Sequence, residues 1–471
     1  MRRYKGGLIL QAALKLTGET EFMTGKNAAR AQRAEIRSEY FRYLVPTIIG
    51  QVAHCCYCLA DVFFVGLGVG KDGLAALNVA LPIFTVYTTF SIMVGVGAAT
   101  TISVCRGRGE DENVDRVFTM AVVTVLILGA LLSVFGTLFL REIAYLFGAT
   151  DLIVGHVVGY LAPISPFSFI YMLSSAMCVI VRSDGNPRLV MVAATTGNIL
   201  NIVLDYVFVL PLGMGTFGAG LATIIGPVVT CLLLSMHFLR HYNQVHFTRR
   251  FFSPRLFARM VRNGAGSGVL ETSSGFVILM FNLTLLRVSG ETAVAIFSII
   301  SNIGYVGKGI FNGMAQVAQP IISISYGSGT YSRMKTVNRF AMLTALSFSL
   351  VVFGLIALFP GQIITLFISS DAQIIAMGAP AVVLYFLSLP FTGLNTILMY
   401  YFQSTEHARI TALVAVLRGI VLVYAALRIF SSLWGLTGVW LALFAAEALT
   451  FLAFYPVKLH LDARLSDGKI V

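Results

Sequence analysis

The sequence has few charged residues. Only 11% of its 471 residues are Asp, Glu, Lys or Arg, and 57% are hydrophobic, whereas about a quarter of the residues of soluble domains are charged. A soluble domain of this composition would leave too much apolar surface in water. The mean hydropathy of +0.84 instead predicts many membrane-spanning helices of about 20 residues each. We expect an all-α polytopic membrane protein.

The sequence also lacks the short motifs of common enzymes. It has no Gly-x-Ser-x-Gly, no His-Glu-x-x-His and no phosphate-binding loop ending in Gly-Lys-Ser/Thr. Its six cysteines form no disulfide framework, and five of them lie in apolar segments. We therefore expect a non-enzyme without a cofactor. Any uphill transport would draw on an ion gradient, in which one charge is worth about 2.3 kcal/mol per 100 mV.

What the sequence has instead is a series of long apolar segments. Twelve of them are long enough to cross a bilayer, and they lie at about 42–66, 79–105, 117–139, 157–180, 189–210, 217–239, 264–286, 293–318, 337–359, 376–401, 410–431 and 434–457.

The net charge of +12 is unevenly distributed over these segments. If both termini lie on one side, 27 of the 33 basic residues fall on that side. The positive-inside rule makes that side the cytoplasm, so we expect a multi-pass protein of the cell membrane with both termini cytoplasmic. We interpret the excess positive charge as a signal of membrane topology, so no nucleic-acid partner is expected. The exceptions are four residues on the other side and two within spans: Lys71, Arg141, Arg287, Arg428, Lys308 and Arg418.

The chain repeats itself at an offset of 220 residues. The matches include Gly70 with Gly290, Gly107 with Gly327, and Gly215 with Gly435. An even number of spans in each half gives both halves the same orientation, so two six-helix lobes should be related by a pseudo-two-fold axis along the membrane normal. The expected divisions are a cytoplasmic arm (1–40), an N-lobe (41–240), a linker (241–260), a C-lobe (261–458) and a cytoplasmic tail (459–471). A monomer is expected.

Five polar residues of the first half share one membrane level near the outer side: Asp61, Tyr160, Asn201, Asp205 and Thr223. An acid in a span costs roughly 2.5–3.5 kcal/mol at the helix centre, so a chain that keeps one usually uses it. Asn201 and Asp205 lie four residues apart, on one helix face. Two carboxylates close together in a poorly solvated place cannot both ionise cheaply, so they should share a proton or a cation. The simpler alternative is hydrogen bonding between helices.

The second half carries different charges within its spans: Glu271, Lys308, Arg418 and Glu447. Internal ion pairs among them are one interpretation. The other is a second functional site, either an acidic wall for cationic substrates or a relay. In the first span, His54, Cys58 and Asp61 share a helix face, but one helix alone rarely supplies a metal site, and packing is the simpler role for His54. Pro46 removes a helical hydrogen bond, which makes it a hinge candidate.

Several of these residues together resemble the multidrug and toxic compound extrusion (MATE) family of efflux antiporters, over about residues 38–460. The resemblance is carried by Pro46 with Leu59-Ala-Asp-Val-Phe-Phe-Val-Gly66, by Val181-Arg-Ser-Asp-Gly-Asn-Pro-Arg188, by Asn201-Ile-Val-Leu-Asp205 and by Gly213-Met-Gly-Thr-Phe-Gly-Ala-Gly-Leu-Ala-Thr223. The pattern is closer to the bacterial MepA-like and DinF-like branches than to the eukaryotic one.

The resemblance implies two lobes in a V that alternate between outward- and inward-facing states, exchanging H⁺ or Na⁺ for small cationic or amphiphilic drugs. It implies a coupling site at Asp61, Asn201, Asp205 and Thr223, with Tyr160 beside it and a bend at Pro46. Any bound Na⁺ would take these same ligands.

The C-lobe fits the resemblance less well. Glu271 matches an acid of some NorM-like members, but Asn395 stands in span 10, where those members have a carboxylate. That difference argues against a Na⁺ site in the C-lobe. Two other functions stay open at this stage: a lipid-linked sugar flippase of the same broader superfamily, and a non-transporting membrane receptor or channel.

Overall fold

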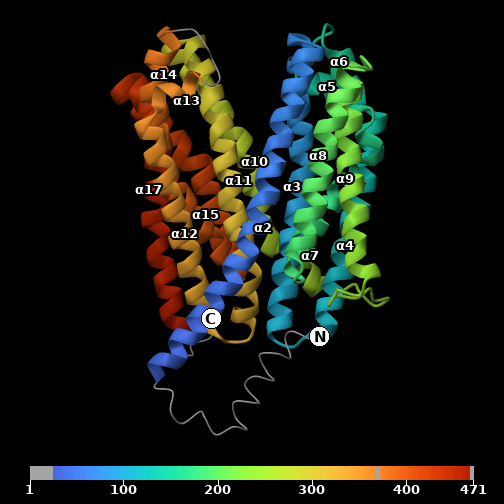
Figure 1. Ribbon diagram of the computed structural model, residues 1–471, viewed down its shortest axis with the longest axis vertical. Coiled ribbons are helices and arrows are strands. Elements are labelled where there is room, and N and C mark those ends of the chain that lie inside the picture. Colours follow the sequence, from blue (N-terminus) through green and yellow to red (C-terminus); the bar gives the residue numbers. More distant parts are fainter. Residues whose placement is uncertain (1–24, 366–371, 467–471) are drawn as a thin grey trace.

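The computed structural model describes residues 25–365 and 372–466, and within them it contains helices and no strand. The helices form two lobes that lean apart like the arms of a V (Figure 1). The lobes meet at the end where α2 begins and α17 ends, here called the closed end. They diverge at the other end, the open end, where α5, α6, α13 and α14 lie (Figure 1).

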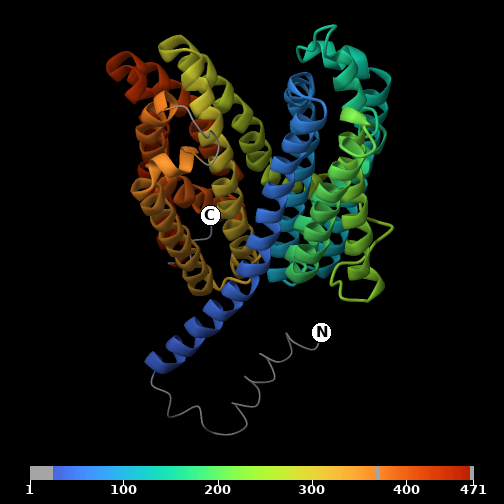
Figure 2. The same cartoon turned by 45° about the horizontal axis from the view of Figure 1, so that its top comes forward.

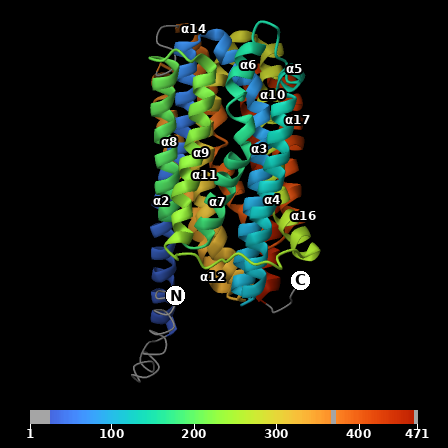
Figure 3. The same ribbon diagram turned by 90° about the vertical axis from the view of Figure 1, so that its right-hand side faces the viewer.

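The N-lobe comprises α2 to α9 and faces the viewer in Figure 3. Its helices are α2 (Gly25–Gly68), α3 (Lys71–Gly107), α4 (Asp111–Leu138), α5 (Leu140–Leu146), α6 (Val154–Leu161), the short 3₁₀ turn η2 (Ser165–Phe167), α7 (Ser168–Ser183), α8 (Pro187–Val209) and α9 (Gly215–Leu239).

The C-lobe comprises α10 to α17. Its helices are α10 (Pro254–Ser289), α11 (Glu291–Gly327), α12 (Tyr331–Leu358), α13 (Pro360–Thr365), α14 (Ala372–Phe386), α15 (Leu389–Ser404), α16 (Ala408–Val416), the π-helical turn η3 (Leu417–Val421) and α17 (Leu422–Ser466).

The described helices include eleven that are long and apolar enough to cross a membrane, one fewer than the twelve predicted. The difference lies in Ala408–Leu465, which would measure about 87 Å at 1.5 Å per residue, far more than the ~30 Å of a hydrocarbon core. Gly435 interrupts it with a non-helical backbone (φ 55°, ψ −131°), so this continuous assignment joins two helices across a kink. The predicted span 410–431 ends before that kink, and the predicted span 434–457 begins at it.

Several helices extend beyond the predicted spans. The second half of the expected arm, from Gly25, is already part of α2, and residues 1–24 lie outside the described part. The expected linker is shorter than 241–260, because α10 begins at Pro254. The expected tail continues α17 to Ser466. Apolar composition marks the bilayer-crossing portion of a helix, whereas the helix itself continues into water.

The 220-residue repeat is visible in the backbone. Glycines at matching positions share left-handed conformations, which side chains with a Cβ rarely adopt. The φ angles are 83° at Gly70 and 77° at Gly290, and 59° at Gly215 and 55° at Gly435. These glycines end or begin equivalent helices, so the two halves turn the chain in the same way at the same places.

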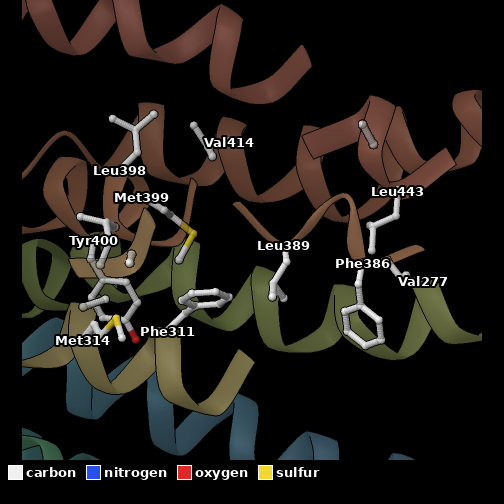
Figure 4. Packing of buried hydrophobic residues seen from close by; sticks show 14 of the residues in the cluster. Val277, Phe311, Met314, Phe386, Leu389, Leu398, Met399, Tyr400, Val414 and Leu443 are labelled. Carbon is white, nitrogen blue, oxygen red and sulfur yellow. The ribbon is translucent and has the colours of Figure 1, made fainter. Parts of the chain in front are cut away.

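Each lobe has its own buried apolar core, but each core also includes the start of a helix whose remainder lies in the other lobe. Ile36, Tyr40 and Leu44, at the start of α2, belong to the core of the C-lobe, whereas Val65 near the end of α2 belongs to that of the N-lobe. In return, Met260 at the start of α10 belongs to the N-lobe core. Figure 2 shows α2 passing from one lobe to the other, and Figure 4 shows part of the C-lobe core.

Glycines bring the lobes into backbone contact at the closed half of the molecule. A Cβ at Gly264 of α10 would overlap the carbonyl oxygen of Met93 of α3, and one at Gly97 would overlap that of Met260. Nearer the closed end, Gly107 and its repeat partner Gly327 are each pressed against the other's helix. Small residues at such positions let helices approach closely in a membrane, where van der Waals packing drives their association.

We predict that Gly264→Ala destabilises the protein by about 1–3 kcal/mol, because its methyl group has no room between α3 and α10. Gly275→Ala, on the same helix, meets no atom within 4 Å and should be neutral or slightly stabilising. Thermal unfolding of both variants in detergent measures the difference. Equal unfolding temperatures would show that the α3–α10 contact is not tight.

Candidate functional site

Five predicted residues come together inside the N-lobe, from four different helices. Asp61 lies on α2, Tyr160 on α6, Asn201 and Asp205 on α8, and Thr223 on α9. All five are buried, and Asp205 has no exposed surface at all. They are brought together because α8 packs along both α2 and α9, while α6 packs on α9.

Tyr160 links two of these helices by hydrogen bonds. Its hydroxyl donates to Oδ2 of Asp61 at 2.9 Å and lies 3.5 Å from Oγ1 of Thr223. Thr223 in turn donates to the carbonyl oxygen of Ala219 at 2.9 Å. Tyr160 therefore holds the Asp61 carboxylate in place.

The remaining polar atoms of the cluster have no hydrogen-bond partner among the described residues. They are Oδ1 of Asp61, both amide atoms of Asn201 and both carboxylate oxygens of Asp205. A buried polar group without a partner costs about 1–3 kcal/mol, and more if it is charged. The cost falls when a proton, a cation or water occupies the space, and carboxylate and amide oxygens are suitable ligands for a hard cation.

The two carboxylates also act on each other. Asp61 and Asp205 lie close enough for each to be affected by the other's charge, and Tyr160 lies within the field of both. Two negative charges that share a buried site repel strongly, so one positive charge between them is favourable. Any proton or cation held there would therefore be shared by the pair and would not belong to one acid alone.

A large cavity of about 390 Å³ lies between the lobes. Asn198, Asn201 and Thr223 line its N-lobe wall, whereas Asp61 and Asp205 lie behind that wall. The polar cluster therefore borders the cavity through its neutral members. Pro46, the hinge candidate, also lines the cavity, within a continuous α2.

Two of the four predicted C-lobe residues face this cavity. Glu271 of α10 and Lys308 of α11 both line it, and Lys308 is exposed there. No ion pair within 4.0 Å joins them, although each is affected by the other's charge. Of the internal ion pairs expected as one interpretation of the four charges, Glu271 with Lys308 is therefore not one, whereas Arg418 with Glu447 is.

The other charged pair is internal to the C-lobe. Arg418 donates through Nε to Oε1 of Glu447 at 2.8 Å, and the amide of Asn395 donates to Oε2 of the same carboxylate at 2.7 Å. The guanidinium also bonds the carbonyl of Thr392 and the hydroxyl of Thr396. Arg418, Glu447 and Asn395 are buried, and this hydrogen-bonded network does not line the cavity.

The floor of the cavity contains residues that the sequence did not single out. Arg182, expected on the cytoplasmic side of span 4, lines the cavity and donates to Oε1 of Gln316, which also accepts from Gln51 at 3.1 Å. These residues join α7 of the N-lobe to α11 of the C-lobe. Because Arg182 lies at the cytoplasmic end of a predicted span, the sequence predicted it to be one of the basic residues that set the membrane topology. The structure places it in the cavity floor instead, because α7 and α11 lean inward there.

A second network holds the lobes together nearer the closed end. Glu406, between α15 and α16, accepts from Arg259 at 2.6 and 2.8 Å and from the amide of Asn263 at 2.9 Å. The same amide donates to Thr101 of α3 at 3.1 Å, and Arg108 lies 3.8 Å from Glu406. This network ties the C-lobe to the N-lobe and has no signal in the sequence.

In the described part of the chain, no group of three His, Cys, Asp or Glu side chains is arranged to hold a metal ion. The sequence pattern of His54, Cys58 and Asp61 therefore does not become a cluster of that kind. Cys58 instead lies 3.5 Å from the hydroxyl of Tyr305.

We predict that Glu447→Gln destabilises the protein by roughly 3 kcal/mol, because the buried Arg418 would lose the carboxylate that pairs with it. Glu271→Gln, which breaks no ion pair, should cost less than about 1 kcal/mol. Thermal unfolding in detergent compares them. The double variant Arg418→Met/Glu447→Leu should recover most of the loss. If it unfolds as easily as Glu447→Gln, the pair is not what stabilises this part of the lobe.

Comparison with known proteins places this geometry in a family. The MatE family model matches the chain twice, at residues 46–207 and 265–427, which agrees with the 220-residue repeat. The multidrug export protein MepA of Staphylococcus saprophyticus is 25% identical over 446 residues, 93% of this chain and 97% of that protein. MepA of Staphylococcus aureus MRSA252 is 23% identical over 92% of this chain and 96% of that protein.

Solved structures agree with these relatives. An outward-facing multidrug resistance MATE family transporter of the MOP superfamily has a TM-score of 0.87 and 25% identity over 92% of this chain and 97% of its own. A MOP superfamily transporter from Pyrococcus furiosus, described as having a binding pocket of reversed polarity, has a TM-score of 0.86 at the same identity and coverage. The two family matches, the relatives and the V of two lobes together show that this chain is a member of the MatE family of multidrug efflux transporters.

Proposed function

We propose that the chain is an antiporter that exchanges H⁺ or Na⁺ for cationic or amphiphilic drugs by alternating access of its two lobes. The observation that carries the proposal is Asp205: a fully buried carboxylate with two unpartnered oxygens, beside a second acid. A protein has little reason to keep such a group at membrane depth unless a cation visits it.

The proposed coupling site consists of Asp61, Asn201, Asp205 and Thr223, with Tyr160 positioning Asp61. Binding of a proton or Na⁺ removes the repulsion between the carboxylates and partners their free oxygens. Release of the ion restores the repulsion between the carboxylates and the cost of leaving their oxygens without a partner. Only a difference of this kind between states allows an ion to shift a conformational equilibrium, since a ligand with equal affinity for both states shifts nothing.

We infer that the open end faces the outside and the closed end the cytoplasm. The excess of Lys and Arg lies toward the closed end, where both termini are expected. In this arrangement the cavity is open to the outside, which resembles the outward-facing state named for one solved relative. A cation from outside would reach the cluster through Asn201 and Thr223, which line the cavity.

Alternating access requires the closed half to open. That step would break the bond of Arg182 to Gln316 and the Glu406 network, and it would separate α3 from α10. These contacts are hydrogen bonds, ion pairs and close approaches at glycines. The bacterial relatives named as export proteins support placement in the cell membrane.

We expect that Asp205→Asn and Asp61→Asn each abolish gradient-driven ethidium efflux from proteoliposomes, because a neutral amide cannot take up and release the coupling charge. A pH gradient and a Na⁺ gradient are imposed separately, so that the active one identifies the ion. Asp111→Asn changes an exposed carboxylate at the start of α4 and serves as the matched control, with efflux near that of the unmodified protein.

Reconstituted amounts and unfolding temperatures must match among the variants for the comparison to count. Full efflux by both Asp205→Asn and Asp61→Asn would contradict the coupling role of the cluster. No efflux by the unmodified protein under either gradient would contradict the antiporter itself.

A further inference from the structure

A second, smaller pocket lies nearer the closed end than the central cavity, and its volume is about 60 Å³. This is several times the ~10–15 Å³ that one water molecule needs. Three arginines line the pocket together: Arg106, Arg182 and Arg333. We propose that this pocket binds a phosphate group, and that the bound group joins the two lobes at the closed half of the molecule.

The pocket is formed by both lobes. Arg106 of α3 and Arg182 of α7 belong to the N-lobe, whereas Arg333 of α12 belongs to the C-lobe. Arg182 and Gln316 line both this pocket and the central cavity. The hydrogen bond between these two residues therefore lies between the two spaces, and a ligand in the smaller pocket lies on the closed side of that bond.

One of the three arginines has no counter-charge. Within the part of the chain that the structure describes, Arg182 donates to the neutral amide of Gln316 and forms no ion pair. The other two arginines are each 2.5 Å from a carboxylate oxygen, in the pairs Arg106–Asp184 and Arg333–Glu39. Three guanidinium groups against two carboxylates leave one net positive charge around the pocket. An anion is attracted there, and a cation is repelled.

The pocket also has hydrogen-bond donors without an acceptor. The Nε atoms of Arg182 and Arg333, one from each lobe, are buried and have no hydrogen-bond partner among the described residues. A buried donor without a partner is costly, most of all on a charged group. A phosphate group carries several acceptor oxygens, and its geometry matches the planar fork of a guanidinium. One phosphate group can therefore accept hydrogen bonds from arginines of both lobes at once.

A phosphate group held by both lobes favours the state in which the lobes meet at the closed half. If the lobes separate there, Arg333 moves away from Arg182, and the ligand loses its contacts with one lobe. A ligand that binds one state more tightly shifts the equilibrium toward that state. Bound phosphate would therefore slow the transport cycle. This consequence rests on the proposed alternating access, whereas the binding itself does not.

The test follows thermal unfolding of the purified full-length protein in detergent while potassium phosphate is added, against potassium chloride of equal ionic strength. A saturable rise in unfolding temperature above that in chloride gives an apparent Kd for phosphate. A parallel titration with phosphatidic acid, against phosphatidylcholine, tests whether a lipid headgroup supplies the phosphate group. A rise with either probe that depends on the pocket arginines supports the proposal and identifies the source. A rise with neither probe overturns it.

Gln316→Glu gives Arg182 a carboxylate within the protein. We expect this variant to unfold at or above the temperature of the unmodified protein without phosphate, and to lose the response to phosphate. Arg333→Gln should weaken the apparent Kd about tenfold, because a charge-assisted hydrogen bond is lost. Arg250→Gln removes an exposed charge of the segment between α9 and α10, outside the pocket. It serves as the matched control, with the apparent Kd unchanged.

Lys308→Gln tests where the anion binds. Lys308 lines the central cavity but not the smaller pocket, so its replacement should leave the response to phosphate unchanged. An apparent Kd that weakens in Lys308→Gln but not in Arg333→Gln would place the anion in the central cavity and overturn the proposal. So would an unchanged response in Gln316→Glu. The experiment needs no ion gradient, so its failure leaves the antiporter assay unaffected, and a failure of ion coupling leaves the phosphate titrations interpretable.

Discussion

The fold depends on the close approach of α3 and α10, where Gly97 and Gly264 bring two backbones into contact. That contact fixes how far the lobes interpenetrate at one half of the molecule, and therefore how widely they diverge at the other. The central cavity is the space left by this divergence. A membrane supplies no hydrophobic force between helices, so such shape-matched contacts decide where two lobes touch.

Within this common scaffold the two halves have separate chemistry. The N-lobe keeps two acids with unpartnered oxygens at Asp61 and Asp205. The C-lobe pairs its deepest acid, Glu447, with Arg418. Within the described residues, the N-lobe therefore holds two buried acids without a counter-charge, whereas the C-lobe pairs Glu447 and leaves Glu271 without an ion pair. The repeat gives both halves the same arrangement of helices and turns, whereas the polar side chains within the spans differ between the halves.

The sequence predicted much of this architecture. Hydropathy predicted the spans, and the 220-residue repeat predicted the two halves. Both signals can be read along the chain without knowing which helices touch. The grouping of Asp61, Tyr160, Asn201, Asp205 and Thr223 followed from their shared depth. Contacts between distant helices were not predictable in this way. The place of Arg182 in the cavity floor, the Glu406 network and the separation of Glu271 from Lys308 depend on how the lobes lean.

The exchange of helix segments between the cores has a mechanical consequence. The start of α2 is packed in the C-lobe, and the start of α10 is packed in the N-lobe. Each of these segments ties its helix to the other lobe by buried apolar contacts, so separating the lobes there would expose apolar side chains of both cores. If the angle between the lobes changes, each of these segments must either move with the lobe into which it packs or leave that core.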